Sequence, residues 1–189
     1  MDDKTWNSGS GVKKTFNEIL EEAKEHSRFK GTVYVGTDSF FRKDQCIFSN
    51  AICFYGANGQ QGGRYFFKRV KFSKKQFPNL SIRMIKEAEQ TIDLAQQISE
   101  KIPDVKLELH LDISNTEKGE GTSYLASMLI GYVQGSGFEC KIKPDAFAAA
   151  SIADKHSKWH LEKKIQQDIN KRWTIGIIIE EAPNFLTPE

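Results

Sequence analysis

The stretch that decides the fold is Thr32-Val33-Tyr34-Val35-Gly36-Thr37-Asp38, a mostly apolar, β-branched run that ends at an aspartate. Such residues favour extended backbone, and the run therefore predicts a strand that ends at Asp38. Residues 46–55 form a second apolar run, and Ala57-Asn58-Gly59 after it is typical of a tight hairpin turn. Residues 65–72 return as a third strand, so these three strands are predicted to form an antiparallel meander.

The remaining chain alternates helical and extended patterns, and a helical pattern at residues 13–28 precedes the meander. Five further elements are predicted in order: a helix from Pro78-Asn79 to about Ile102, a strand at 105–113, a helix at 122–134, a short strand at 139–143, and an alanine-rich helix from Pro144-Asp145 past Lys164. The segment from Trp173 to Ile179 is a further candidate strand. This order predicts an α/β fold with a mixed five-stranded sheet, in which right-handed crossovers add parallel strands to the meander.

The composition is that of one globular domain. The 189 residues are 39% hydrophobic and 28% charged, and no apolar run approaches the length of a membrane span. We expect a single domain over residues 1–189, with a flexible segment at 1–12 and a C-terminal extension of unassigned role at 158–189. The N-terminus lacks a secretion-signal pattern, and the three cysteines form no CxxC pair. These features predict a cytoplasmic protein without a disulfide framework.

Two aspartates stand at the ends of predicted strands. Asp38 ends the first strand, and Asp112 lies on the polar side of the strand at 105–113. Each alone has an ordinary explanation, an Asx turn for Asp38 and an exposed strand face for Asp112. Because the two strands are predicted neighbours, their carboxylates come together, repel each other and favour a bound cation. Hard cations such as Mg²⁺ and Mn²⁺ prefer oxygen ligands, and a pair of them supports phosphodiester hydrolysis.

Further acidic ligands must come from helices, where the pattern leaves alternatives open. Glu87 and Glu89 flank the apolar stripe of their helix on opposite sides, so periodicity does not choose between them. Asp145 begins the last predicted helix, where an ordinary N-cap explains it equally well. Asp154 lies farther along that helix and faces either the site or solvent.

At these residues the sequence resembles the YkuK-type ribonuclease H-like family of bacterial proteins. The matching segments are Val35-Gly36-Thr37-Asp38-Ser39, Arg83-Met84-Ile85-Lys86-Glu87, His110-Leu111-Asp112-Ile113-Ser114, and Lys143-Pro144-Asp145 through Ala149-Ala150-Ser151 to Ala153-Asp154-Lys155. The resemblance spans about residues 30–157 and implies a ribonuclease H-like fold with a nuclease-type acidic site. It assigns that site to Asp38, Asp112, Glu87 rather than Glu89, and Asp145, with Asp154 next. Phe40 departs from the polar residue expected after Ser39.

A basic segment with interleaved phenylalanines is the candidate nucleic-acid contact. Its basic residues are Lys68, Arg69, Lys71, Lys74 and Lys75. Such a segment is typical of proteins that follow a phosphate backbone, but the net charge is only +2, and a solvated strand edge is the simpler explanation. His156 and His160 have a spacing that suits zinc, but without a third ligand a solvated pair is preferred. His110 either orients water or phosphate near the metals or is hydrogen-bonded beneath a helix.

Two functions therefore compete. The first is a metal-dependent nuclease acting on RNA or DNA, in which the acids hold Mg²⁺ or Mn²⁺ and the basic segment contacts the strand that is cut. The second is a non-catalytic nucleic-acid- or protein-binding module that retains the fold, which Phe40 and the modest net charge favour.

Overall fold

The computed structural model describes residues 5–59, 62–114 and 125–158 of the chain. By its internal contacts the chain divides into two units, Met1–Ser157 and Lys158–Glu189, and the fold described below is that of the first. His160 and the candidate strand at 173–179 lie outside the described residues. Among the described helices, none is both long and apolar enough to cross a membrane.

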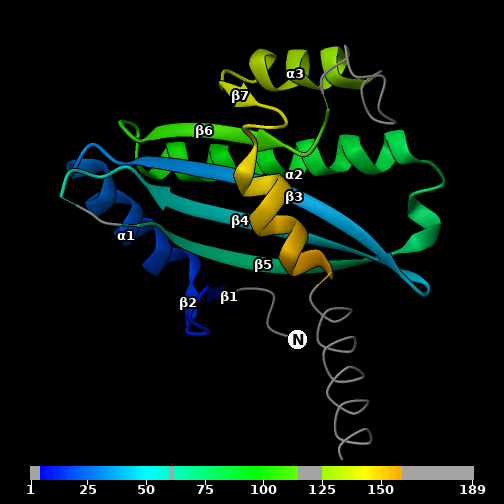
Figure 1. Cartoon of the computed structure of the whole chain (residues 1–189), viewed down its shortest axis with the longest axis horizontal. Helices are drawn as coiled ribbons and strands as arrows, with labels where there is room; N and C mark the ends of the chain where they lie inside the picture. The colour runs from blue at the N-terminus through cyan, green and yellow to red at the C-terminus, as the bar shows by residue number, and fades with distance from the viewer. Residues whose placement is uncertain (1–4, 60–61, 115–124, 159–189) are drawn as a thin grey trace, which may run out of the picture. The chain divides into compact units, whose positions relative to one another are not determined.

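A single seven-stranded sheet runs through this unit in the order β2-β1-β5-β4-β3-β6-β7 (Figure 1). Its strands are β1 (Thr5–Ser8), β2 (Lys13–Thr15), β3 (Thr32–Arg42), β4 (Gln45–Tyr55), β5 (Arg64–Ser73), β6 (Lys106–Leu111) and β7 (Cys140–Lys141). β3, β4 and β5 form the predicted antiparallel meander, whereas β6 pairs in parallel with β3, and β7 in parallel with β6. The prediction of an α/β fold with a mixed sheet is confirmed, with seven strands in place of five.

The two additional strands come from the N-terminal part of the chain. Residues 5–8, within the segment expected to be flexible, form β1, which pairs with β2 and, through Asn7 and Phe67, with β5. Trp6 of β1 is only 4% exposed, and burial of a large apolar side chain contributes about 1.5–3 kcal/mol to stability. Four residues are too few to show a clear alternation of apolar and polar side chains. The formation of β1 therefore depends on its pairing with the distant β5 rather than on its local sequence.

Three helices cover one face of the sheet. They are α1 (Phe16–Arg28), α2 (Leu80–Lys101) and α3 (Ala126–Gly135). α1 begins at a reciprocal capping box between Thr15 and Glu18, and α2 begins where Asn79 Oδ1 accepts a hydrogen bond from the backbone N–H of Ile82. These caps satisfy N–H groups that the first turn of a helix leaves without partners.

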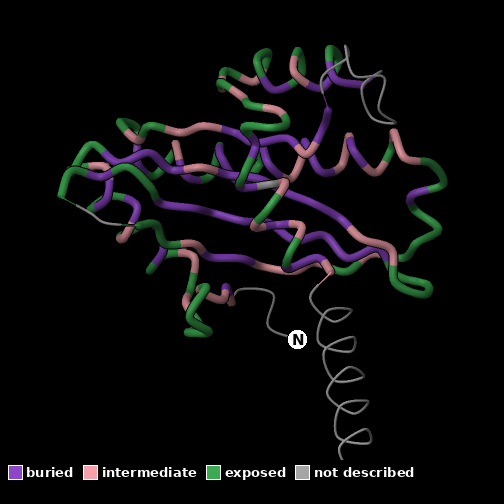
Figure 2. Tube along the Cα trace, viewed as in Figure 1, coloured by how far each residue is buried: buried purple, intermediate pink, exposed green. Residues whose placement is uncertain are grey.

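The opposite face is covered by one helix that spans residues 147–158, called the covering helix below. Val33 and Val35 of β3 pack with α1 and α2, whereas Ala51 and Cys53 of β4 pack with the covering helix. The central strands β3 and β4 are buried along most of their length between these two layers (Figure 2). The strict alternation of side chains along each strand thus supplies two cores, one on each face.

The covering helix contains the π-helical segment η4 (Ala148–Ala153) and then continues as α-helix through the last described residues. It crosses the sheet as the yellow-to-orange ribbon in Figure 1. It begins at Phe147 rather than at the predicted Pro144-Asp145, which instead form a turn and a bend after β7. π-Helical turns are rare and are frequently found at functional sites.

The strand that carries Asp38 is longer than the sequence predicts. β3 continues to Arg42, so Asp38 pairs with Ser49 of β4 inside the strand instead of ending it. The parallel partner β6 stops earlier, with Leu111 in register with Thr37. Asp38 therefore lies where the parallel pairing ends, and this end of the sheet carries the candidate site.

Candidate acidic site

Asp38 lies beneath the covering helix. Side chains alternate along β3, which places Asp38 on the same face as Tyr34, whose ring contacts Phe147 of the covering helix. Its Oδ2 accepts a 2.6 Å hydrogen bond from Ser157 Oγ, and only 7% of the residue is exposed. Burial of an ionised carboxylate is costly, so this position depends on groups that compensate its charge.

Glu87 approaches the same end of the sheet from α2. Its Oε1 accepts a 2.6 Å hydrogen bond from Ser39 Oγ, and Arg83 Nε lies 4.0 Å from the same oxygen. The alternative, Glu89, instead pairs with Lys86 Nζ at 2.9 Å, and its side chain is 38% exposed. The structure therefore separates two glutamates that helical periodicity leaves equivalent, and only Glu87 is buried against β3.

Asp112 directly follows the last residue of β6. Because Leu111 is in register with Thr37, the register carries Asp112 to the position beside Asp38. Lys143 Nζ lies 2.9 Å from Asp112 Oδ1, and the Asp112 side chain is 16% exposed. Two aspartates that are far apart in sequence thus come to the same end of the sheet.

The three carboxylates act on one another electrostatically. The pKa of Glu87 is raised to about 8, first because the carboxyl is buried and second because Asp38 is close, with a smaller contribution from Asp112. The hydrogen bond from Ser39 and the charge of Arg83 oppose this rise in pKa without cancelling it. Acids from β3, from α2 and from the end of β6 therefore share one local field, in which Glu87 is largely protonated at neutral pH.

Carboxylate oxygens suit hard divalent cations, and a bound cation would relieve their repulsion. Across the described ranges, however, no group of three or more His, Cys, Asp or Glu side chains is gathered closely enough to hold a metal ion. Each acid is held instead by a protein partner: a serine at Asp38, a serine at Glu87 and a lysine at Asp112. The donor set fits Mg²⁺ or Mn²⁺, provided that the carboxylates turn from these partners toward one another.

The other two candidate acids differ in their relation to this site. Asp145 is exposed in the bend before the covering helix, and its charge acts on the buried His110. Asp154 is half-buried on the covering helix, one turn before Ser157, whose hydroxyl also donates to the Asp154 carbonyl at 2.9 Å. Asp154 lies on the helix that contacts Asp38, whereas Asp145 lies two residues after Lys143, which contacts Asp112.

His110 is enclosed beneath the covering helix. Its Nδ1 accepts a 2.9 Å hydrogen bond from the backbone N–H of Ala148, which places the proton on Nε2, 3.0 Å from Glu108 Oε1. Burial lowers the pKa of His110, and Glu108 opposes this shift. Both ring nitrogens are used within the fold, which favours the hydrogen-bonded interpretation over a role in positioning water or phosphate.

His156 anchors the covering helix to β5. Its ring stacks on Phe67 with 3.5 Å between centroids and 7° between planes, and its Nε2 lies 3.3 Å from the Tyr65 hydroxyl. The pKa of His156 is lowered to about 4, first by burial and then by the positive charges of Arg69 and Lys155. A neutral, packed imidazole explains this residue without a zinc ion.

The basic segment is divided between different surfaces. Lys68 lines a cavity with residues of α1 and α2, whereas the charge of Arg69 acts on His156 under the covering helix. Lys74 opens the 3-10 turn η1 (Lys74–Gln76), and its Nζ lies 5.2 Å from the Phe41 ring centroid. The remaining members, Lys71 and Lys75, are exposed. Alternation along β5 therefore prevents these cations from forming one continuous stripe.

Two residues of the site carry almost no sequence signal. Ser39 and Ser157 matter as hydroxyl donors to buried carboxylates, a role that no motif indicates. Ser39 is at least adjacent to Asp38, but 119 positions separate Ser157 from that aspartate, and no spacing rule joins them. The pairing depends entirely on how the covering helix crosses the sheet.

Comparison with known proteins agrees with this architecture. A family model described as Ribonuclease H-like matches residues 14–158, which is most of the chain. A search of curated proteins finds no match. The matched range includes the strands, the α2 helix and the covering helix that together carry the candidate acids. The chain therefore belongs to the ribonuclease H-like family.

Proposed function

We propose that this protein is a divalent-metal-dependent phosphodiesterase that hydrolyses RNA or DNA, with Mg²⁺ or Mn²⁺ held by Asp38, Glu87 and Asp112. The observation that carries the proposal is geometric: Asp38, Glu87 and Asp112, which are far apart in sequence and largely buried, lie at one end of the sheet. Carboxylates that lie close together repel one another when they are ionised, and a bound cation would relieve that repulsion. The closeness of these acids therefore favours a cation site. Family membership alone would not support this function, because one fold hosts many activities.

Bound divalent cations would supply an activated water and neutralise charge on the phosphate. Glu87 would release its proton to solvent when it becomes a ligand, and Ser39 would keep its carboxylate directed at β3. Arg83, 4.0 Å from Glu87, would then have a guanidinium available for a phosphate oxygen. These residues would thus orient the ligands and the substrate rather than take part in bond cleavage.

A fourth ligand is better supplied by Asp154 than by Asp145. Asp154 lies on the covering helix close to the Ser157 hydroxyl that contacts Asp38. Asp145 is exposed in the bend before that helix, and its charge acts on His110. We therefore propose Asp154 as the acid that completes the site.

Cleavage of labelled RNA and DNA in the presence of Mg²⁺ tests the proposal. Asp38→Asn keeps the size and most hydrogen bonding of the side chain but removes its charge, and it should reduce cleavage to background. Asp44→Asn is the matched control, because Asp44 is exposed in the turn between β3 and β4. Equal cleavage by Asp38→Asn and the unaltered protein, or undiminished cleavage in EDTA, would refute the proposed function.

A binding module without catalysis is the second candidate. It is favoured by the contacts of Ser157 with Asp38 and of Lys143 with Asp112, which keep two acids engaged with protein groups. In that case, binding to single-stranded RNA or DNA should weaken with salt, persist in EDTA and produce no cleavage. Mg²⁺-dependent cleavage that is lost in Asp38→Asn would exclude this candidate.

A further inference from the structure

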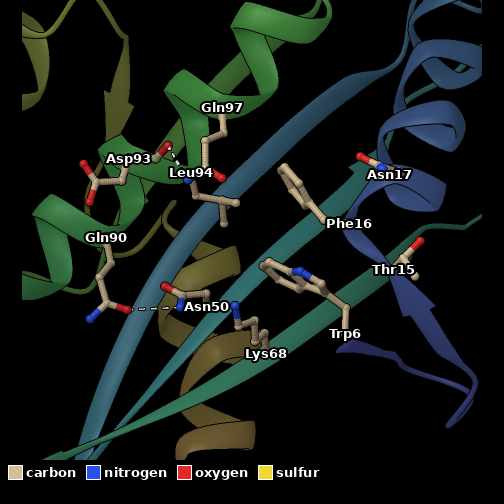
Figure 3. A pocket seen from close by; sticks show the side chains of 10 residues that line it. All are labelled: Trp6, Thr15, Phe16, Asn17, Asn50, Lys68, Gln90, Asp93, Leu94 and Gln97. Atoms are coloured by element: carbon tan, nitrogen blue, oxygen red, sulfur yellow. Dashed lines mark hydrogen bonds between the residues drawn. The ribbon is translucent and has the colours of Figure 1, made fainter. Parts of the chain in front are cut away.

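A cavity of about 570 Å³ opens between α1 and α2, on the face of the sheet opposite the covering helix (Figure 3). Phe16 of α1 stands on one side, Gln90 and Gln97 of α2 stand on the other, and Trp6 and Lys68 lie between them. Small-molecule sites commonly have volumes of about 300–1,000 Å³, so this cavity is large enough for a ligand. None of the acids of the candidate metal site lines it.

The cavity is lined by one cation, Lys68, and one acid, Asp93, whose carboxylate points away from Lys68 (Figure 3). Lys68 is half-buried on β5, in register with Asn50 of β4, and its ammonium points toward the space between the walls (Figure 3). In the part of the chain that the structure describes, the ammonium makes no ion pair with an acidic side chain. A partly buried ammonium is best stabilised by a charged partner, so the cavity favours an anionic ligand.

An aromatic pair forms the apolar side of the cavity. The rings of Trp6 and Phe16 stack with 6.0 Å between centroids and 24° between planes. Trp6 is buried, whereas Phe16 is half-buried at the start of α1, so Phe16 presents the accessible ring. A planar heterocycle such as a nucleobase can stack against such a ring.

Amide groups provide the polar edge. Asn50 is held in place because its Oδ1 accepts from Thr37 Oγ1 at 2.7 Å and its Nδ2 donates to Gln90 Oε1 at 3.0 Å. Gln97 lies about one helical turn after Leu94, is exposed, and lines the same cavity. Amides present a donor and an acceptor side by side, an arrangement that matches the edge of a nucleobase.

We propose that this cavity binds a mononucleotide, with its phosphate at Lys68, its base against Phe16 and its base edge at the amides. The proposal goes beyond the hydrolytic activity and does not depend on it, because the two sites share no residue. An ammonium, an aromatic ring and fixed amides in one cavity match the three chemical parts of such a ligand.

The test is a nuclear magnetic resonance titration of the full chain in EDTA, with adenosine 5′-monophosphate, adenosine and inorganic phosphate as separate probes. The mononucleotide should bind saturably and shift the indole N–H signal of Trp6, which Trp6→Phe identifies. Adenosine should bind about tenfold more weakly, because it lacks the charged contact worth roughly 1.4 kcal/mol. Absence of a saturable shift at Trp6, or phosphate alone binding as tightly as the mononucleotide, would overturn the proposal.

Two variants and two controls assign the contacts. Lys68→Gln should weaken mononucleotide binding about tenfold, to the level of adenosine, whereas Lys71→Gln, exposed on the same strand, should leave it unchanged. Phe16→Leu should weaken binding of both the mononucleotide and adenosine at least about fivefold, through lost stacking. Asp38→Asn should bind like the unaltered protein, which separates this cavity from the metal site. Equal losses in Lys68→Gln and Lys71→Gln would indicate general attraction and refute the proposed contact.

Discussion

Two polar side chains, the buried His110 and the half-buried Asp112, lie two positions apart near the end of β6, and they differ in how their polarity is compensated. His110 has a hydrogen-bonding partner for each ring nitrogen and is neutral. Asp112 lies near two other acids, Asp38 and Glu87. The charges of Asp112 and Asp38 help burial to raise the pKa of Glu87 to about 8. Burial alone therefore does not mark a functional site, whereas like charges that remain in one another's field do.

The largest expected effect is on the histidine side of this comparison. His110→Ala should lower the free energy of unfolding by about 3–5 kcal/mol, because it leaves a cavity under the covering helix and an unpaired Ala148 N–H. Urea unfolding at pH 7 measures this loss. Glu108→Gln keeps an acceptor near Nε2 and should cost less than about 1 kcal/mol. Similar, small losses in both variants would show that His110 is not the structural contact described here.

The acidic side should behave in the opposite way. A raised pKa in the folded state means that Glu87 contributes stability below its unfolded pKa of about 4.5, and that this contribution is lost as pH rises through about 8. In EDTA, the unaltered protein should therefore lose on the order of 3 kcal/mol relative to Glu87→Gln between pH 5 and pH 8. Urea unfolding at both pH values measures the difference. Glu89→Gln is the control and should keep the pH dependence of the unaltered protein. If Glu87→Gln keeps it as well, Glu87 is not the group that causes the loss of stability.

A bound cation should compensate the charges of Asp38, Glu87 and Asp112, as the hydrogen bonds of His110 already compensate its polarity. If Mg²⁺ joins the acids, it should stabilise the folded state at pH 8 by about 1.4 kcal/mol when its concentration is ten times the Kd. Thermal unfolding with and without Mg²⁺ measures this gain, with Na⁺ at matched ionic strength as the salt control. Asp38→Asn should show no gain, and equal stabilisation of both proteins would assign the effect to ions bound elsewhere.

The smallest effect concerns the hydroxyl that joins the covering helix to Asp38. Ser157→Ala should lower the free energy of unfolding in EDTA by about 1 kcal/mol, the usual value of one hydrogen bond. It should also bind Mg²⁺ at least as tightly as the unaltered protein, because one competitor for Asp38 is gone. Ser151→Ala, exposed on the same helix, is the control for unfolding. Weaker Mg²⁺ binding in Ser157→Ala would mean that the hydroxyl supports the site instead.

Strands with strong local patterns could be predicted from the sequence. The β-branched run of β3 and the leucine alternation of β6 are both present, and their adjacency places Asp38 and Asp112 at one end of the sheet. The predicted end of β3 is wrong because Asp38 and Ser39 are polar, which is typical of a turn. Both side chains are in fact buried and hydrogen-bonded, so they continue the strand to Arg42.

The remaining differences arise from contacts between distant parts of the chain. Helical periodicity could not separate Glu87 from Glu89, because the choice depends on Ser39 of β3. An aspartate after a proline resembles an N-cap, yet Asp145 lies in a bend before the covering helix. Spacing alone cannot anticipate that Ser157 would reach Asp38 across the sheet.

The π-helical segment η4 sets the angular alignment of the α-helical turn after it. Each α-helical residue turns the chain by about 100°, and a π-helical turn holds an extra residue compared with an α-helical one. The covering helix is fixed at its start by the His110 contact to Ala148, so the length of the alanine run sets the direction in which Ser157 points. Deletion of a single alanine would rotate the following turn about the helix axis and direct Ser157 away from Asp38. The length of the alanine run therefore sets the rotation between the contact of Ala148 with His110 and the contact of Ser157 with Asp38.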